Sequence, residues 1–105
     1  MKRRPHEVDV DDALDELIDA MRSLRDAGEL RAFLEDLCTP AELEAMSDRW
    51  KVVPLLAEGV PYREIHERTL VSVTTIGRVA RTLETGAGGY AAALRRQQSR
   101  TSAAQ

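Results

Sequence analysis

The first regular pattern along the chain is a narrow stripe of apolar residues spaced three or four positions apart. Its members are Val10, Leu14, Leu17, Met21 and Leu24. This spacing places them on one face of an α-helix. Asp11 and Asp12 lie in the expected first turn, where carboxylates stabilise the helix dipole, and Gly28 provides a natural end. Because so narrow a stripe suits a helix–helix seam, we expect this helix to pack against another helix, including one from a second subunit.

A second, shorter helix is expected over residues 28–38, with Leu30, Phe33, Leu34 and Leu37 on one face. Thr39 and Pro40 then indicate the start of a third helix. Threonine caps free backbone amides, and proline is tolerated at the first helical position. Glu42 follows three residues after the threonine, so the two side chains are expected to form a capping box.

The third helix is expected to run to about Glu58 and to end at Gly59. The residues of its expected buried face are Leu43, Met46, Trp50, Val53 and Leu56. Pro54 lies inside this helix, and because proline removes one backbone hydrogen bond we expect a kink there.

The next segment predicts two short helices joined by a tight turn. The first covers residues 60–69, the turn is Leu-Val-Ser at 70–72, and Ser72 is a good N-cap for the second. Around the second helix, one side carries Val73, Ile76, Val79, Ala80 and Leu83. The other side carries Thr74, Thr75, Gly77, Arg78, Arg81 and Thr82. This arrangement favours a helix-turn-helix, and the alternative is an ordinary helical hairpin whose solvated face is basic.

The polar side of that second helix suits contact with duplex DNA. Thr74 and Thr75 can donate hydrogen bonds to base edges or phosphates, and Arg78 and Arg81 can reach phosphate or guanine. One residue opposes this interpretation, because Leu70 stands where such turns usually place glycine. A bulky residue there either adopts a strained left-handed conformation or forces a different turn.

After the break GAGG at 86–89, a last short helix is expected over residues 90–97. No strand pattern and no repeat is evident. The expected organisation is a flexible basic arm at 1–8, N-terminal dimerisation helices at 9–38, a helix-turn-helix core at 39–94 and a disordered basic tail at 95–105.

Composition fits one small all-α domain. The chain has 105 residues, of which 43% are hydrophobic and 4% aromatic, so its core must be built mainly from aliphatic side chains. Such small helical chains often share a core between subunits, which makes oligomerisation an expectation. No apolar run approaches the roughly 18 residues of a membrane span. The single cysteine, Cys38, cannot form an internal disulfide and fits a reducing cytoplasm.

The net charge of −3 conceals a marked asymmetry. Residues 1–48 hold 14 acidic and 6 basic residues, a balance of −8, whereas residues 49–105 hold 4 acidic and 9 basic residues, a balance of +5. Phosphate attraction acts locally, so a basic half is compatible with nucleic-acid binding although the whole chain is acidic.

Catalytic and metal chemistry find no support in the sequence. Cys38, His6 and His66 are not at metal-ligand spacing, and Ser47, Asp48 and His66 do not form a catalytic triad pattern. We therefore expect neither an enzyme nor a cofactor.

Three segments resemble the Trp-repressor-related YerC/YecD family, over about residues 33–94. They are LCTPAEL, DRWKVVPLLAEGVPYREI and VTTIGRVARTLETGAGGY. The resemblance implies an all-helical, intertwined homodimer with two helix-turn-helix heads about 34–36 Å apart on a palindromic operator. By position, its DNA-facing residues are Arg63, His66, Val73, Thr74, Thr75 and Gly77. Ser72, Arg78 and Arg81 complete the candidate DNA-binding set.

The resemblance also implies an effector site. The Trp repressor holds tryptophan between two arginines, beside a hydroxyl and a capping threonine, and the matching residues here are Arg49, Arg78, Thr82 and Thr39. Val79 departs from the pattern, because the Trp repressor has a glycine there that lets the indole lie close. We expect the valine to project into that space, so that any small-molecule effector is not tryptophan.

The sequence thus predicts a cytoplasmic, homodimeric, sequence-specific DNA-binding transcriptional regulator, a repressor that recognises double-stranded DNA. The alternative is a helical dimerisation or protein-interaction module without specific DNA binding, which the overall acidic charge and Leu70 favour.

Overall fold

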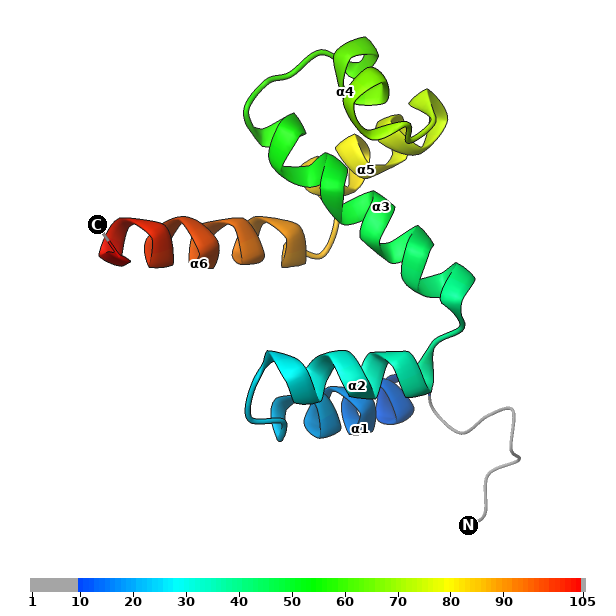
Figure 1. Cartoon of the computed structure of the whole chain (residues 1–105), viewed down its shortest axis with the longest axis vertical. Helices are drawn as coiled ribbons and strands as arrows, with labels where there is room; N and C mark the ends of the chain where they lie inside the picture. Colours follow the sequence, from blue (N-terminus) through cyan, green and yellow to red (C-terminus); the bar gives the residue numbers. More distant parts are fainter. Residues whose placement is uncertain (1–9, 105) are drawn as a thin grey trace. The chain divides into compact units, whose positions relative to one another are not determined.

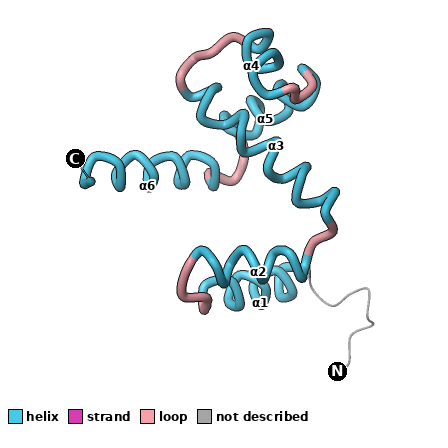
Figure 2. Tube along the Cα trace, in the orientation of Figure 1, coloured by secondary structure: helices cyan, strands magenta, loops and turns pink. Residues whose placement is uncertain are grey.

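The computed structural model describes residues 10–104, with side chains to residue 100, and within that range the chain is entirely helical (Figures 1 and 2). Its elements are α1 (Val10–Arg22), α2 (Ala27–Leu37), α3 (Pro40–Ala57), α4 (Tyr62–Thr69), α5 (Val73–Thr85) and α6 (Gly89–Ala104). The predicted all-α class is confirmed. Among the described residues, no helix combines the length and apolarity that crossing a bilayer requires. The basic arm predicted at 1–8 and His6 lie outside the described range.

Internal contacts divide the chain into two compact units, Met1–Leu43 and Glu44–Gln105. In the first unit, α1 ends at Arg22 and α2 begins only five positions further along, at Ala27. Asp26 caps α2 by accepting a hydrogen bond from the Glu29 amide at 2.9 Å. The prediction that Gly28 ends the first helix is therefore wrong, because the Asp26 cap draws this glycine into the first turn of α2.

The apolar stripe of α1 divides into two parts. Leu17 and Met21 are half-buried, and so is Leu24, which lies in the loop after α1 and not in the helix as predicted. Val10 and Leu14 remain 76% and 50% exposed, and Ile18, next to the stripe, is 44% exposed. Neither α1 nor α2 contains a fully buried residue. A large part of the apolar surface of α1 therefore stays uncovered by the residues that the structure describes.

The predicted capping box at the start of α3 is confirmed. The Thr39 amide donates to the Glu42 carboxylate at 2.7 Å, and the Glu42 amide donates to the Thr39 hydroxyl at 3.1 Å. These two bonds, of which the backbone one is the larger cause, lower the pKa of the Glu42 carboxyl below its usual value. The helix continues through Pro54 to Ala57, and Gly59 follows with φ of +81°.

The core of the second unit lies where α3, α4 and α5 meet. Its buried residues are Val52, Val53, Ile65, Val71, Ile76 and Val79. Two details correct the predicted inner face of α3. Val52 is fully buried although the expected face omitted it, and Met46, expected to be buried, is 40% exposed. The inner face of α3 is thus centred on adjacent valines in its second half.

The last helix is longer than the sequence predicts. α6 continues past Gln97 to Ala104, so most of the segment 95–105, predicted to be disordered, is helical. Alanine, arginine and glutamine are strong helix formers, and this propensity outweighs the scarcity of apolar residues there. The start of α6 is held against α3 by a ring contact between Trp50 and Tyr90, whose centroids are 6.2 Å apart.

Candidate nucleic-acid interface

The two helices α4 and α5 and the turn between them form a small unit that we call the head, residues 62–85. Ile65 of α4 and Ile76 of α5 are both completely buried, and Val71 of the turn is 6% exposed. These three side chains join the core described above. In Figure 1, α4 and α5 lie at an angle to each other across the end of α3. The two short helices and the tight turn that the spacing predicts are therefore present.

The turn is fixed by a set of short hydrogen bonds. The Leu70 amide donates to the His66 carbonyl at 2.7 Å, which ends α4. The Thr69 hydroxyl donates to the Ile65 carbonyl at 2.7 Å and accepts from the Val71 amide at 3.1 Å. Thr69 was not among the residues singled out from the sequence. A threonine at the end of a short helix, two residues before the next buried position, is the pattern that could have indicated this role.

Leu70 adopts the left-handed conformation, with φ of 64° and ψ of 11°. Of the two alternatives that the sequence left open, the strained conformation is therefore the one adopted. Its side chain is 81% exposed, so the strain is not offset by burial. The chain thus forms a tight turn of this type without the usual glycine.

His66 also supports the turn. Its Nδ1 lies 2.7 Å from the Val71 carbonyl oxygen. Because a carbonyl oxygen can only accept a hydrogen bond, the ring hydrogen lies on Nδ1, and Nε2 does not take part in the bond to Val71. The imidazole ring is exposed at the surface of the head. Nε2 is therefore the ring atom that can contact another molecule.

The predicted N-cap of α5 is confirmed. The Ser72 hydroxyl accepts from the Thr75 amide at 3.1 Å and donates to the Thr75 hydroxyl at 3.0 Å. The two side chains are therefore held together at the start of the helix. Ser72 acts first as a structural cap, and its hydroxyl is already engaged within the chain.

The head exposes most of the predicted DNA-binding residues. Those with exposed side chains are Arg63, His66, Ser72, Val73, Thr74, Arg78 and Arg81, whereas Thr75 and Gly77 are half-buried. Val73 corrects the helical-wheel assignment to the apolar side, because it is 51% exposed at the first position of α5. At Gly77, a Cβ would meet nothing within 4 Å, so the backbone of α5 is open to close approach there.

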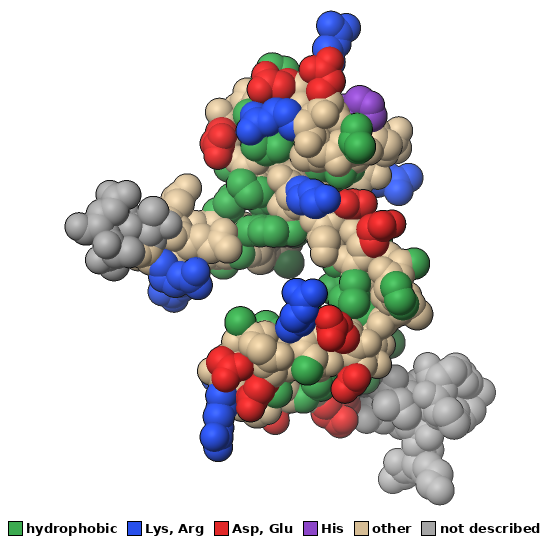
Figure 3. Space-filling model, viewed as in Figure 1, with side chains coloured by type: hydrophobic (Ala, Val, Ile, Leu, Met, Phe, Trp, Pro, Cys, Tyr) green, Lys and Arg blue, Asp and Glu red, His purple; other side chains and the backbone are tan. Residues whose placement is uncertain are grey.

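The charges of the head are mixed. Arg68 is paired with Glu64 at 3.2 Å, which neutralises one basic side chain of α4. By contrast, the guanidinium groups of Arg63, Arg78 and Arg81 form no ion pair or hydrogen bond with any described residue. Figure 3 shows basic and acidic side chains intermingled on the visible side of α4 and α5. The three unpaired guanidinium groups are the ones available to a phosphate backbone.

Comparison with known proteins assigns the chain to a family. The sequence profile described as "Trp repressor protein" matches residues 12–98, well over half of the 105 residues. The chain belongs to the Trp repressor family. The resemblance noted on the sequence motifs is thereby confirmed, and the match also takes in the helices α1 and α2.

Individual members of the Trp repressor family are similar over most of their length. An uncharacterized protein named YerC, from Bacillus subtilis (strain 168), is 40% identical over 83 residues, which are 79% of this chain and 80% of that protein. The structure of a TrpR-like protein from Eubacterium eligens ATCC 27750 has a TM-score of 0.78 at 38% identity, covering 83% of this chain and 90% of the other. A proposed Trp repressor from Staphylococcus aureus gives 0.79 at 33% identity, covering 92% and 96%.

Of the four effector residues implied by the family, Arg49, Arg78 and Thr82 lie in the second unit and Thr39 in the first. Arg49, Arg78 and Thr82 are exposed, and the two arginines bond to no described residue. The hydroxyl of Thr39 is engaged in the capping box of α3. The four residue types that the family's effector site uses are present, and the effector assignment stays a prediction.

The side chain of Val79 does not point into the space that the family's effector would fill, as the resemblance implies that it should. The side chain is 2% exposed and packs in the core with the valines of α3, so it does not project into open space beside Arg78. The physical reason is that its position on α5 follows Ile76 by three residues, which places both on the inner face. Valine at this position therefore acts by filling the space between α3 and α5.

Proposed function

We propose that this protein is a sequence-specific DNA-binding transcriptional regulator of the repressor type, without catalytic activity, that acts on double-stranded DNA in the cytoplasm. The observation that carries the proposal is the amphipathic start of α5. Its inner side is locked into the core by Ile76, while Thr74 and Arg78 are exposed next to the open backbone at Gly77. A short polar side chain and an arginine at the start of a capped helix are suited to contact base edges in the major groove.

The active form is a homodimer. The support is the exposed apolar surface of α1, where Val10, Leu14 and Ile18 retain 76%, 50% and 44% of their accessible surface. A second copy of the chain would bury these side chains, each worth roughly 1.5–3 kcal/mol when fully buried. A dimer presents two heads, and two-fold symmetry then requires a palindromic operator.

Each arginine of the head has a separate role in this proposal. Arg78, in the exposed first half of α5, contacts bases, whereas Arg63 and Arg81 neutralise phosphates on either side of it. Because Nδ1 of His66 carries the hydrogen that is bound to the Val71 carbonyl, Nε2 is an acceptor and receives a hydrogen bond from a base amino group. Ser72 positions the helix, and the backbone at Gly77 allows close approach of the DNA.

Selection of bound sequences from a random duplex pool tests this function. The wild-type protein should enrich a palindrome whose half-sites are centred about 34–36 Å apart. Arg78→Ala should lose the enrichment, while Arg68→Ala serves as a matched control because Arg68 is already paired with Glu64. A pool that remains random after repeated rounds with the wild-type protein would contradict specific binding.

The second candidate is a helical dimerisation or protein-interaction module without specific DNA binding. The net charge of −3, with a balance of −8 in the first 48 residues, favours it. The same selection experiment distinguishes the two candidates. If the protein is an interaction module, it should be a folded dimer and yet enrich no DNA sequence.

Tryptophan is not the effector under this proposal. Val79 occupies the position of the family's glycine and fills the space between α5 and α3. Inserting an indole there would require repacking, which costs on the order of 1–3 kcal/mol. Calorimetric titration should detect no tryptophan binding at millimolar concentration, and binding at micromolar concentration would refute this part of the proposal.

A further inference from the structure

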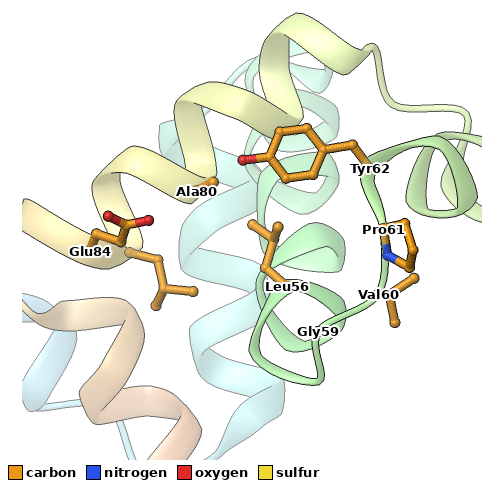
Figure 4. Close-up of a pocket in the computed structure, with 8 residues that line it drawn as sticks. Leu56, Gly59, Val60, Pro61, Tyr62, Ala80 and Glu84 are labelled. Atoms are coloured by element: carbon orange, nitrogen blue, oxygen red, sulfur yellow. The ribbon is translucent and has the colours of Figure 1, made fainter.

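A groove lies between the end of α3, the start of α4 and α5, and none of its lining residues is among the four that match the family's effector site. Its volume is about 400 Å³, which falls in the range of small-ligand pockets. It is lined by Leu56, Gly59, Val60, Pro61, Tyr62, Ala80, Leu83 and Glu84. Figure 4 shows these residues coming from the end of α3, the loop after it, the start of α4 and the second half of α5. We call this cavity the α3–α5 groove.

The walls of the α3–α5 groove are mainly aliphatic. Leu56, Val60 and Leu83 are half-buried hydrophobic residues that pack against the core with one side. Ala80 presents only a methyl group, which leaves room beside α5. The groove therefore offers an apolar bed for an alkyl or aryl group of a ligand.

Two polar groups without protein partners lie at the groove. The Glu84 carboxylate projects from α5, and the Tyr62 side chain extends from the start of α4 towards α5 (Figure 4). Neither side chain forms a hydrogen bond or ion pair with any described residue. Arg81, three residues before Glu84 on the same helix, also leaves the carboxylate unpaired. Glu84 is the one charged group among the lining residues.

Because its walls are aliphatic and its one charged group is an unpaired carboxylate, the groove favours a positively charged ligand. The apolar face of α1 from a second copy is a poor candidate, because Asp15, Glu16 and Asp19 accompany it and would be brought near Glu84. An anionic ligand is disfavoured for the same reason. An ammonium or guanidinium group gains a charge-assisted hydrogen bond from the Glu84 carboxylate.

We propose that the α3–α5 groove binds a small amphipathic cation, with its alkyl or aryl body on Leu56, Val60 and Leu83 and its ammonium group on Glu84. The ligand class is a primary amine or guanidine that carries a hydrophobic group. This site shares no residue with the set formed by Arg49, Arg78, Thr82 and Thr39, and the charge preference is opposite. The proposal does not depend on DNA binding.

Titration with three probes of the same size tests the proposal. The probes are phenethylamine, 2-phenylethanol and phenylacetate, which share the aromatic body and carry a cationic, neutral or anionic end at pH 7. The full-length protein should bind the amine with a dissociation constant at or below about 1 mM, the alcohol more weakly and the carboxylate not measurably. Amide chemical-shift changes on adding the amine should centre on Gly59, Tyr62 and Leu83.

Two substitutions separate charge recognition from general hydrophobic adsorption. Glu84→Gln should weaken phenethylamine binding roughly tenfold and leave 2-phenylethanol binding unchanged, because only the charge-assisted bond is lost. Glu67→Gln, which removes an exposed carboxylate of α4 outside the groove, is the matched control and should leave both affinities unchanged.

Three results would overturn the proposal. They are equal affinity for the amine and the carboxylate, chemical-shift changes that avoid the groove, and amine binding that survives Glu84→Gln in full. Absence of amine binding together with slow hydrogen exchange of the Gly59 and Leu83 amides in the wild-type protein would show that another copy of the chain covers the groove, and would also overturn it.

Discussion

At the scale of single residues, the most unusual position is Leu70. It holds a left-handed backbone conformation, with φ of 64°, although its side chain is 81% exposed and packs against nothing that repays the strain. Such a conformation costs an ordinary residue roughly 1–2 kcal/mol. The hydrogen bonds of Thr69, Val71 and His66 around it hold the turn in place. Strain in a turn at a binding head is often retained for function rather than stability.

Replacing Leu70 should therefore stabilise the protein. Leu70→Gly removes the side-chain clash, and after the larger entropy of glycine in the unfolded chain is subtracted we expect a gain of about 0.5–1 kcal/mol. Urea unfolding monitored by circular dichroism measures it. As a control, Glu67→Gly within α4 should lower stability by about 1 kcal/mol. A lower denaturation midpoint for Leu70→Gly would show that the leucine side chain makes a stabilising contact, for instance with a second subunit.

The stability of the folded protein should depend on pH through Glu42, and the lowered pKa of its carboxyl gives the sign of this dependence. The hydrogen bonds of Thr39 lower the pKa of the Glu42 carboxyl in the folded protein. Its contribution to the free energy of unfolding is therefore present above the ordinary carboxyl pKa of about 4.3, and it is lost as the pH falls through the lowered value. The melting temperature of Glu42→Gln should lie below that of the wild-type protein at pH 7, and the two should converge in acid. A constant difference down to pH 3 would argue against this linkage, and Glu44→Gln is the control.

At the scale of secondary-structure elements, α5 divides its tasks between two sides. Ile76 is completely buried in the core, and Arg78, two positions later, is exposed and unpaired. The inner side fixes where the helix lies, and the outer side is the one proposed to contact DNA. Stability and DNA binding should therefore be separable by substitution within one helix.

The matched pair Ile76→Ala and Arg78→Ala tests that separation. Ile76→Ala should lower the free energy of unfolding by about 2–5 kcal/mol, because a large buried side chain is removed. Arg78→Ala should leave the melting temperature within about one degree of wild type, since exposed unpaired side chains contribute little. Its affinity for a selected duplex should fall by about 1–3 kcal/mol. If Arg78→Ala binds the selected duplex as the wild-type protein does, α5 is not the recognition helix.

The helices also show which features of the sequence determine structure locally. Capping predicts the starts of α3 and α5 correctly, because Thr39 and Ser72 form their bonds within one turn. The ends of helices were less predictable. Gly28 resembles a stop, yet the side chain of Asp26 starts α2 before it, and α6 continues past Gln97 on helix propensity. In both segments, local signals of similar strength favour different structures, so the sequence alone does not show which signal prevails.

The candidate site shows the same division between local and tertiary effects. The amphipathic pattern of α5 was sufficient to predict that Thr74 and Arg78 are exposed. It also put Val79 on the buried side, but it could not predict that Val73 faces solvent, because that depends on how the start of α5 meets α3. The pattern of one sequence describes the polar and apolar faces of a helix. Which residues between those two faces become buried is decided by how the three helices pack.

At the scale of the whole molecule, the chain has more apolar surface than its own core covers. The buried residues belong to the second unit, whereas α1 and α2 contain none. A unit with half-buried and exposed apolar residues gains stability when a second copy covers them. The exposed face of α1 therefore supports the proposed dimer.

Two substitutions in α1 test this dimer. Leu14 is 50% exposed, so Leu14→Glu should leave each chain helical and raise the dimer dissociation constant at least tenfold, since the change occurs twice in each dimer. Leu17 is half-buried within the chain itself, and Leu17→Glu should reduce helix content as well. Light scattering and circular dichroism report the two effects, with Glu16→Gln as a control. A wild-type protein that is a folded monomer at micromolar concentration would exclude the proposed assembly.

The central claim is specific recognition of duplex DNA by the head, and the affinity ratio between a selected and a shuffled duplex tests it most directly. Measured by fluorescence anisotropy at about 150 mM salt, the wild-type protein should bind the selected duplex at least about 10³-fold more tightly than the shuffled one. Arg63→Ala and Arg81→Ala should each weaken binding to both duplexes equally. Each should also reduce the slope of log affinity against log salt concentration by about the amount of one phosphate contact. Equal affinity of the wild-type protein for the two duplexes would contradict the account.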